Sequence, residues 1–183
     1  MSWSSKDKEA TLYYLYMMAD GDISFGEEKI FGEICNEMGL QNLKNEIIEK
    51  CKELAHGKKD ILNVIVNEKI DDEARRSFFG LQNKSVLVRI IWNLVNLGYA
   101  DSVFSKEEQK IVSYLVTKWS IEKDVFQEFL DTADTMLALT KQKEWIVLNF
   151  SEKEEREKRE KDIDEEIKML LDNVTITIKE LKM

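Results

Sequence analysis

The chain has 183 residues, of which 43% are hydrophobic, and this length and composition suit a globular protein with a buried core. Its formal net charge of −9 makes nucleic acid and anionic lipid poor partners, because both are bound through lysine and arginine side chains. The sequence contains no proline and only seven glycines, so few residues would interrupt long helices. We therefore predict an all-α fold.

Apolar residues recur at helical spacing along most of the chain. The expected helices span residues 12–19, 25–38, 43–54, 60–70, 71–81, 84–100, 105–119 and 122–150. The helix at 84–100 is apolar on nearly all sides, so we expect it to be buried on several of them.

The composition changes at Ser151, where charged residues begin to predominate. Within 152–161, acids precede bases by four residues, an order that stabilises a solvated helix. The apolar residues that follow have the 4-3 spacing of a coiled-coil seam: Ile163, Ile167, Leu170, Val174, Thr177 and Leu181. We predict a helical domain at 1–150 and a charged C-terminal helix at 151–183. This helix either lies on its own domain or pairs with a partner protein or a second copy, giving a homo-oligomer.

No segment predicts insertion into a membrane or secretion. The most apolar run, 86–100, contains Arg89 and is shorter than the ~20 apolar residues that a spanning helix needs. Residues 1–9 are polar and charged, unlike a signal peptide. Cys35 and Cys51 fall within apolar helical patterns, which indicates free core thiols in a reducing compartment. We predict a cytoplasmic protein.

Residues 19–30 occur a second time, in altered form, at residues 100–111. Six of the twelve aligned positions are identical, and the apolar pattern beyond them stays in register. A repeat of this kind predicts two related helical halves, each with an acidic corner between two helices.

The first corner has the glycine bend of a calcium-binding EF-hand loop but lacks the ligands of that loop. On the EF-hand template, the first and third ligand positions fall on Tyr16 and Met18, neither of which carries a carboxylate. An EF-hand is therefore excluded.

The segment Met18-Ala19-Asp20-Gly21-Asp22-Ile23-Ser24 with Glu27, and its altered copy Tyr99-Ala100-Asp101 with Ser105 and Glu108, resemble a known family. They are similar to the TerB-like tellurite-resistance and stress-associated bacterial proteins and to the N-terminal region of DjlA-type co-chaperones. The resemblance covers residues 12–139. It implies a compact domain of two helical pseudo-repeats without established catalysis, a protein partner, and acidic corners that bind a divalent metal. The implied metal ligands are Asp20, Asp22, Glu27, Asp101 and Glu108.

The chemistry of these side chains would favour Ca²⁺ or Mg²⁺, since carboxylate oxygens are their preferred ligands. If the corners met, their carboxylates would repel one another and would take up protons or a cation. A simpler interpretation needs no cation, because a serine followed three residues later by a glutamate forms a capping box at a helix start. This pattern occurs at Ser24 and Glu27, at Ser105 and Glu108, and at Ser151 and Glu154.

The sequence does not predict an enzyme. Two cysteines and one histidine cannot complete a structural zinc site, and there is no glycine-rich phosphate loop. We therefore predict a non-catalytic, stress-associated interaction module whose acidic surface binds a divalent cation. One alternative is a cation sensor or buffer, and another is a metal-dependent hydrolase that uses the same carboxylates.

Overall fold

A computed structural model describes residues 4–76 and 84–181, in which there are nine helices and no strand. The predicted all-α class is confirmed. Contacts within the chain divide it into two compact units, Met1–Ile121 and Glu122–Met183. The division lies at Glu122, whereas the sequence analysis placed it at Ser151.

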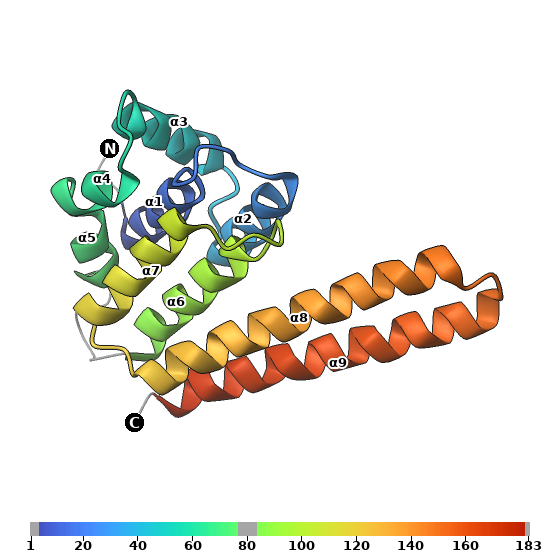
Figure 1. The fold of residues 1–183 in the computed structure, drawn as a ribbon. Coiled ribbons are helices and arrows are strands. Elements are labelled where there is room, and N and C mark those ends of the chain that lie inside the picture. Colours follow the sequence, from blue (N-terminus) through green and yellow to red (C-terminus); the bar gives the residue numbers. More distant parts are fainter. Residues whose placement is uncertain (1–3, 77–83, 182–183) are drawn as a thin grey trace. The chain divides into compact units, whose positions relative to one another are not determined.

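The first unit is built around helix α1, which contacts each of the other six helices of the unit and lies between them in Figure 1. The helices are α1 (Ser5–Met17), α2 (Phe25–Met38), α3 (Lys44–Ala55), α4 (Ile61–Asn67), α5 (Ile70–Arg76), α6 (Lys84–Gly98) and α7 (Lys106–Lys118). Leu12, Tyr13, Leu15 and Tyr16 of α1 have no exposed surface. From Glu9 to Met17 every residue of α1 is buried, so this part of the helix is enclosed by its neighbours.

Helix α1 begins seven residues before the predicted start at residue 12, and the short helix α4 ends three residues before the predicted end at residue 70. Asp60 precedes α4 and accepts a hydrogen bond from the backbone N–H of Asn63 at 3.2 Å, as expected of an N-cap. The helix ends at Asn67, and Lys69 then has a φ of 54°, which breaks the helical path before α5. The end of the predicted helix 71–81 lies outside the described residues.

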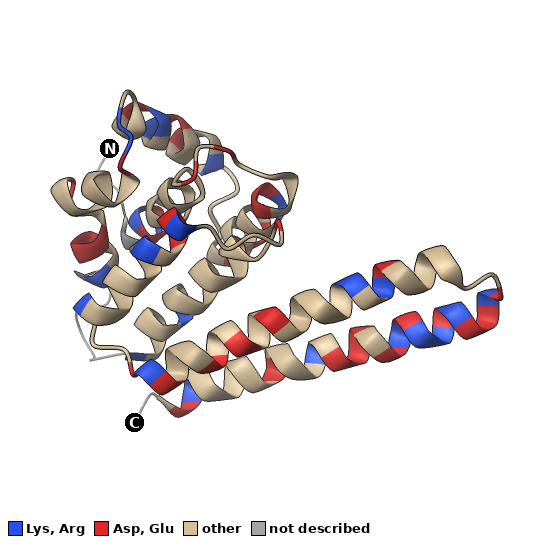
Figure 2. Cartoon of the chain, viewed as in Figure 1, with Lys and Arg blue, Asp and Glu red and all other residues tan. Residues whose placement is uncertain are grey.

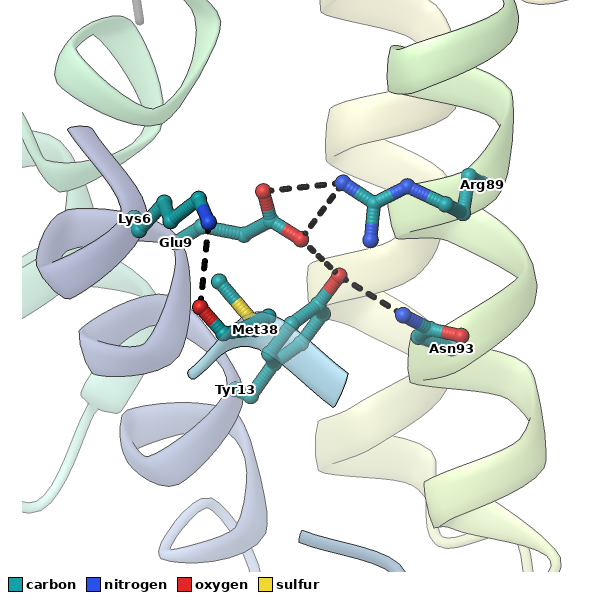
Figure 3. A network of polar contacts seen from close by, with 6 residues as sticks. All are labelled: Lys6, Glu9, Tyr13, Met38, Arg89 and Asn93. Carbon is teal, nitrogen blue, oxygen red and sulfur yellow. Dashed lines mark hydrogen bonds and ion pairs between the residues drawn. The ribbon is translucent and has the colours of Figure 1, made fainter. Parts of the chain in front are cut away.

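A polar network connects α1 to α6 inside the first unit (Figure 3). The Glu9 carboxylate, only 1% exposed, accepts hydrogen bonds from Arg89 at 3.0 Å and from the hydroxyl of Tyr13 at 2.7 Å. The Asn93 amide donates to the same hydroxyl at 3.0 Å. Beside the network, Lys6 donates to the carbonyl of Met38 at the end of α2. A buried carboxylate needs partners of this kind, and Arg89 supplies the balancing charge.

The second unit is an antiparallel hairpin of α8 (Lys123–Asn149) and α9 (Lys153–Glu180) (Figure 1). Its core contains Leu139, Ile146 and Ile163, with Phe150, Ile167 and Leu170 packed against them. The seam predicted on α9 therefore faces α8 of the same chain, and for this reason α8 groups with α9 rather than with the first unit. A second copy would have to bind elsewhere on the hairpin.

The surface of the hairpin alternates in charge, as Figure 2 shows along α9. Glu155 and Arg159 pair at 2.8 Å in the predicted order, with the acid four residues before the base. Arg156 and Lys161 instead pair with acids four residues after them, Glu160 and Glu165. The predicted capping box at Ser151 and Glu154 is wrong, because the N-cap is Glu152, without a side-chain capping bond. Glu154 thereby lies at the second helical position instead of the third.

Trp145 of α8 is 56% exposed and packs edge-on against Phe150. No helix in the described part of the chain is long and apolar enough to cross a bilayer.

Candidate functional site

The two acidic corners of the first unit contain the same turn. After α1, Asp20 accepts a hydrogen bond from the backbone N–H of Asp22 at 3.2 Å. After α6, Asp101 accepts the equivalent bond from Val103 at 2.9 Å. An aspartate that binds the backbone two residues later stabilises a tight turn, so each aspartate has a structural role in its corner.

Each corner continues into a capping box. The backbone N–H of Ser24 donates to Glu27 at 2.7 Å, and that of Ser105 donates to Glu108 at 2.8 Å. In both boxes the serine hydroxyl accepts a bond from the backbone N–H of the glutamate. Both glutamates are only 3% exposed. The capping interpretation of these four residues is confirmed, and it uses one carboxylate oxygen of each glutamate.

Two glycines allow the corners to pack against each other. A Cβ atom at Gly26 in the first turn of α2 would lie 2.5 Å from the carbonyl oxygen of Ala100 in the second corner. A Cβ atom at Gly98, the last residue of α6, would clash with the Tyr16 hydroxyl and the Phe104 ring. Only a residue without a side chain permits such close approach, so the corners form one continuous surface.

The close packing places four of the five predicted ligands within electrostatic range of one another. Burial raises the pKa of Glu108 to about 7; the hydrogen bonds from Ser105 oppose this shift, and the charges of Glu27 and Asp20 add to it. Burial likewise raises the pKa of Glu27, with contributions from Asp20 and Asp101. The neighbouring carboxylate charges therefore disfavour ionisation of both glutamates, as expected for acids held close together.

The fifth predicted ligand, Asp22, is exposed in the first corner. Its backbone holds the Asp20 turn, and its side chain extends the acidic surface outward.

Tyr16 lies beneath the corners and was not singled out as a site residue by its sequence pattern. Its hydroxyl oxygen is buried. Burial raises its pKa well above the ordinary value, and the charges of Glu108 and Glu27 raise it further. Glycines within helices, at Gly26 and Gly98, are the sequence signal that could have indicated the packing around Tyr16. A glycine inside a helix often marks the close approach of another segment.

The corners supply carboxylates but no closed metal cage. In residues 4–76 and 84–181, no three histidine, cysteine, aspartate or glutamate side chains are arranged to hold a metal ion. Mg²⁺ commonly keeps several of its waters and is bound through one or two carboxylates, which the corners can provide. The geometry therefore suits a hydrated cation or the basic groups of a partner.

The cysteines take no part in this site. Both are buried in the core of the first unit, as predicted, and burial raises the pKa of Cys35 to about 11 and that of Cys51 to about 12. A thiol that stays protonated at neutral pH is a poor nucleophile and a poor metal ligand.

Comparison with known proteins gives no further guide to the site. No family model matches the chain, and neither curated proteins nor solved structures gave a match. The resemblance to TerB-like proteins therefore rests on the corner segments and the helical pattern around them.

Proposed function

We propose that the chain is a non-catalytic interaction module of the cytoplasm that presents its two corners as one acidic surface. The observation that carries this proposal is the contact of Gly26 with Ala100, which joins the corners. Burial raises the pKa of Glu27 and of Glu108, and the charges of neighbouring carboxylates from the corners add to both shifts. A cation or a basic partner at this surface would relieve that repulsion.

The bound cation would be Ca²⁺ or Mg²⁺, since the available ligands are oxygens. Asp20, Asp22 and Asp101 are the exposed members of the predicted ligand set and would meet the ion first, whereas Glu27 and Glu108 are buried. The resemblance to TerB-like proteins supports a role in a stress response with a protein partner, and we carry both over as part of the proposal.

Calorimetric titration of chelator-treated protein with CaCl₂ and MgCl₂ tests the cation site. The variant Asp20→Asn with Asp101→Asn keeps a side-chain acceptor for each turn but removes two charges. We expect it to lose most of the binding. The control variant Glu144→Gln with Glu166→Gln removes two exposed charges from the hairpin and should bind normally. Equal binding by both variants would reject a cation site at the corners.

A second candidate function, a cation sensor or buffer, is favoured by the burial of Glu27 and Glu108 beside each other's charge. An ion that binds only the folded state stabilises it in proportion to the logarithm of its concentration. A sensor should therefore show a clear rise in melting temperature at millimolar Ca²⁺, whereas a scaffold that binds only a protein partner should show none.

The metal-dependent hydrolase that the sequence left open has less support. Hydrolysis at a metal centre needs several protein ligands and an open coordination position. The corners supply the charge for such a centre, but the described residues include no trio of ligands from which to build it.

A further inference from the structure

An aromatic side chain is exposed where the two corners meet. Phe25, the first residue of α2, is 84% exposed, the largest exposed fraction among the large hydrophobic residues described. It adjoins Gly26, whose backbone contacts Ala100 of the second corner. In that second corner Val103 is 63% exposed. Two apolar side chains are therefore presented to solvent by adjoining segments.

The fold gives Phe25 no packing role. The core side of α2 consists of Phe31, Ile34, Cys35 and Met38, all buried. Phe25 also does not cap the helix, since Ser24 and Glu27 perform that task. Aromatic residues are enriched among the side chains that dominate protein interfaces, where they fill a pocket in the partner.

Acidic residues predominate among the exposed charged residues of the segment that contains this aromatic side chain. Between residues 20 and 37 the exposed acids are Asp20, Asp22, Glu28, Glu33 and Glu37. Lys29 is the one base in that range. The exposed side of α2 and the corner before it thus combine an apolar anchor with a rim of negative charge.

We propose that Phe25, Val103 and the acidic residues around them form a docking surface for a basic amphipathic helix of a partner protein. The apolar side of that helix would cover Phe25 and Val103, and its lysines and arginines would pair with Asp22, Glu28 and their neighbours. This inference rests on the proposed function and specifies the chemistry of the partner.

Charge decides between this occupant and a second copy of the chain. In α9 acids lie beside the bases, as in the pairs of Glu155 with Arg159 and of Lys161 with Glu165. The hairpin therefore offers no purely basic face. The docking surface needs a partner helix with a purely basic side. Helix α9 of a second copy does not have such a side, whereas a helix with lysine and arginine along one side does.

The test uses the full chain and three labelled synthetic peptides of 18 residues or so, a length that gives about five helical turns. The first is a leucine–lysine peptide with one apolar and one basic helical face. The second has the same composition, scrambled so that no apolar face forms. The third has glutamate in place of lysine. Fluorescence anisotropy measures their binding at low and at moderate salt.

Variants of the protein separate the anchor from the charges. Phe25→Ala removes the anchor, and Leu148→Ala is its matched control, because Leu148 is 83% exposed on α8 of the other unit. Asp22→Asn with Glu28→Gln removes two rim charges. Melting curves verify that each variant is folded, as expected for exposed positions.

We expect the amphipathic basic peptide to bind best and the acidic peptide not to bind. Phe25→Ala should weaken binding about tenfold or more, the loss typical of a central aromatic anchor. Leu148→Ala should bind normally, and the charge variant should bind more weakly with a smaller salt dependence.

Equal binding by the wild type and Phe25→Ala, or by the amphipathic and scrambled peptides, would reject the docking surface. It would show an acidic surface that attracts any base, and the proposed function would stand. No binding of any peptide would also reject the docking surface. Failure of the cation site is recognised separately, by the calorimetric comparison of the Asp20→Asn and Asp101→Asn protein with its control.

Discussion

The backbone of Gly26, in the first turn of α2, lies directly against the carbonyl oxygen of Ala100, which follows α6. A Cβ atom at Gly26 would come within 2.5 Å of that oxygen, closer than carbon and oxygen atoms pack without displacement. This contact fixes the distance between the corners. It therefore also determines how strongly Asp101 of the second corner repels the charge of Glu27.

Replacing Gly26 with alanine should destabilise the first unit. In an open helix this change is favourable by up to about 1 kcal/mol, but here the new methyl group would push against backbone, at a cost of about 1–3 kcal/mol. Gly32→Ala in the same helix is the control, since its Cβ would meet only the flexible end of Lys44 at 3.3 Å. Urea denaturation should show opposite signs for the two variants, and equal stabilisation by both would contradict the close contact.

The raised pKa of Glu108 predicts a loss of stability with rising pH. Its pKa is about 7 in the folded protein against an ordinary 4.5, so between these values the folded state binds more protons than the unfolded state. The free energy of unfolding therefore falls as pH rises through this range, by at most about 3 kcal/mol. Denaturation at a series of pH values measures the slope.

Two variants that each replace a glutamate with glutamine test whether Glu108 causes the pH dependence of the free energy of unfolding. Glutamine at position 108 can still accept the capping bond from Ser105, so Glu108→Gln should flatten the pH profile and raise stability at pH 8. Glu107→Gln changes the exposed neighbour and should leave the profile as it is. An unchanged slope in the Glu108→Gln protein would place the titrating group elsewhere.

Removing the arginine of the buried network should be costly. Arg89→Met leaves the Glu9 carboxylate buried without its balancing charge, and we expect a loss of about 3 kcal/mol. Combining it with Glu9→Gln removes the unpaired charge, so the double variant should lose less than the sum of the two single variants. The exposed pair of Lys52 and Glu49 is the control, and Lys52→Met should leave the free energy of unfolding almost unchanged. Strict additivity within the network would show that Glu9 and Arg89 do not depend on each other.

The hairpin should lose protection from hydrogen exchange when its core is reduced. Ile163→Ala removes a side chain that is 5% exposed in the hairpin core, at an expected cost of about 2–4 kcal/mol. Exchange should increase along α8 and α9. Met169→Ala, at a position 60% exposed on the same helix, should leave the exchange pattern almost unchanged. Similar effects of both variants would contradict the packing of α9 on α8.

Features determined by neighbouring residues could be predicted from the sequence. The start of α2 after Ser24 and of α7 after Ser105 follows from bonds that span three residues, and both capping boxes form as predicted. The acidic turns are equally local, because Asp20 binds the backbone two residues away. These short-range bonds determine the backbone geometry of each corner.

Features that join distant segments could not be predicted in the same way. Glu9 and Arg89 are 80 residues apart, and the sequence shows Arg89 only as an interruption of an apolar run. The division of the chain at Glu122 arises because α8 packs against the apolar side of α9. The spacing of apolar residues predicts such a side but not the helix that packs against it. Gly26 and Gly98 were the local signs that segments meet, but glycine does not identify the segment that approaches.

The antiparallel pairing of α8 and α9 also suggests the order in which their contacts form during folding. The turn between Asn149 and Lys153 joins the helices, so the contacts nearest to it close the smallest loops. Lys143 and Asp164 are 21 residues apart, whereas Glu128 and Thr177, near the open end, are 49 apart. Each pair that forms shortens the loop left for the next, so we expect the hairpin to form first beside its turn and to open first at its other end.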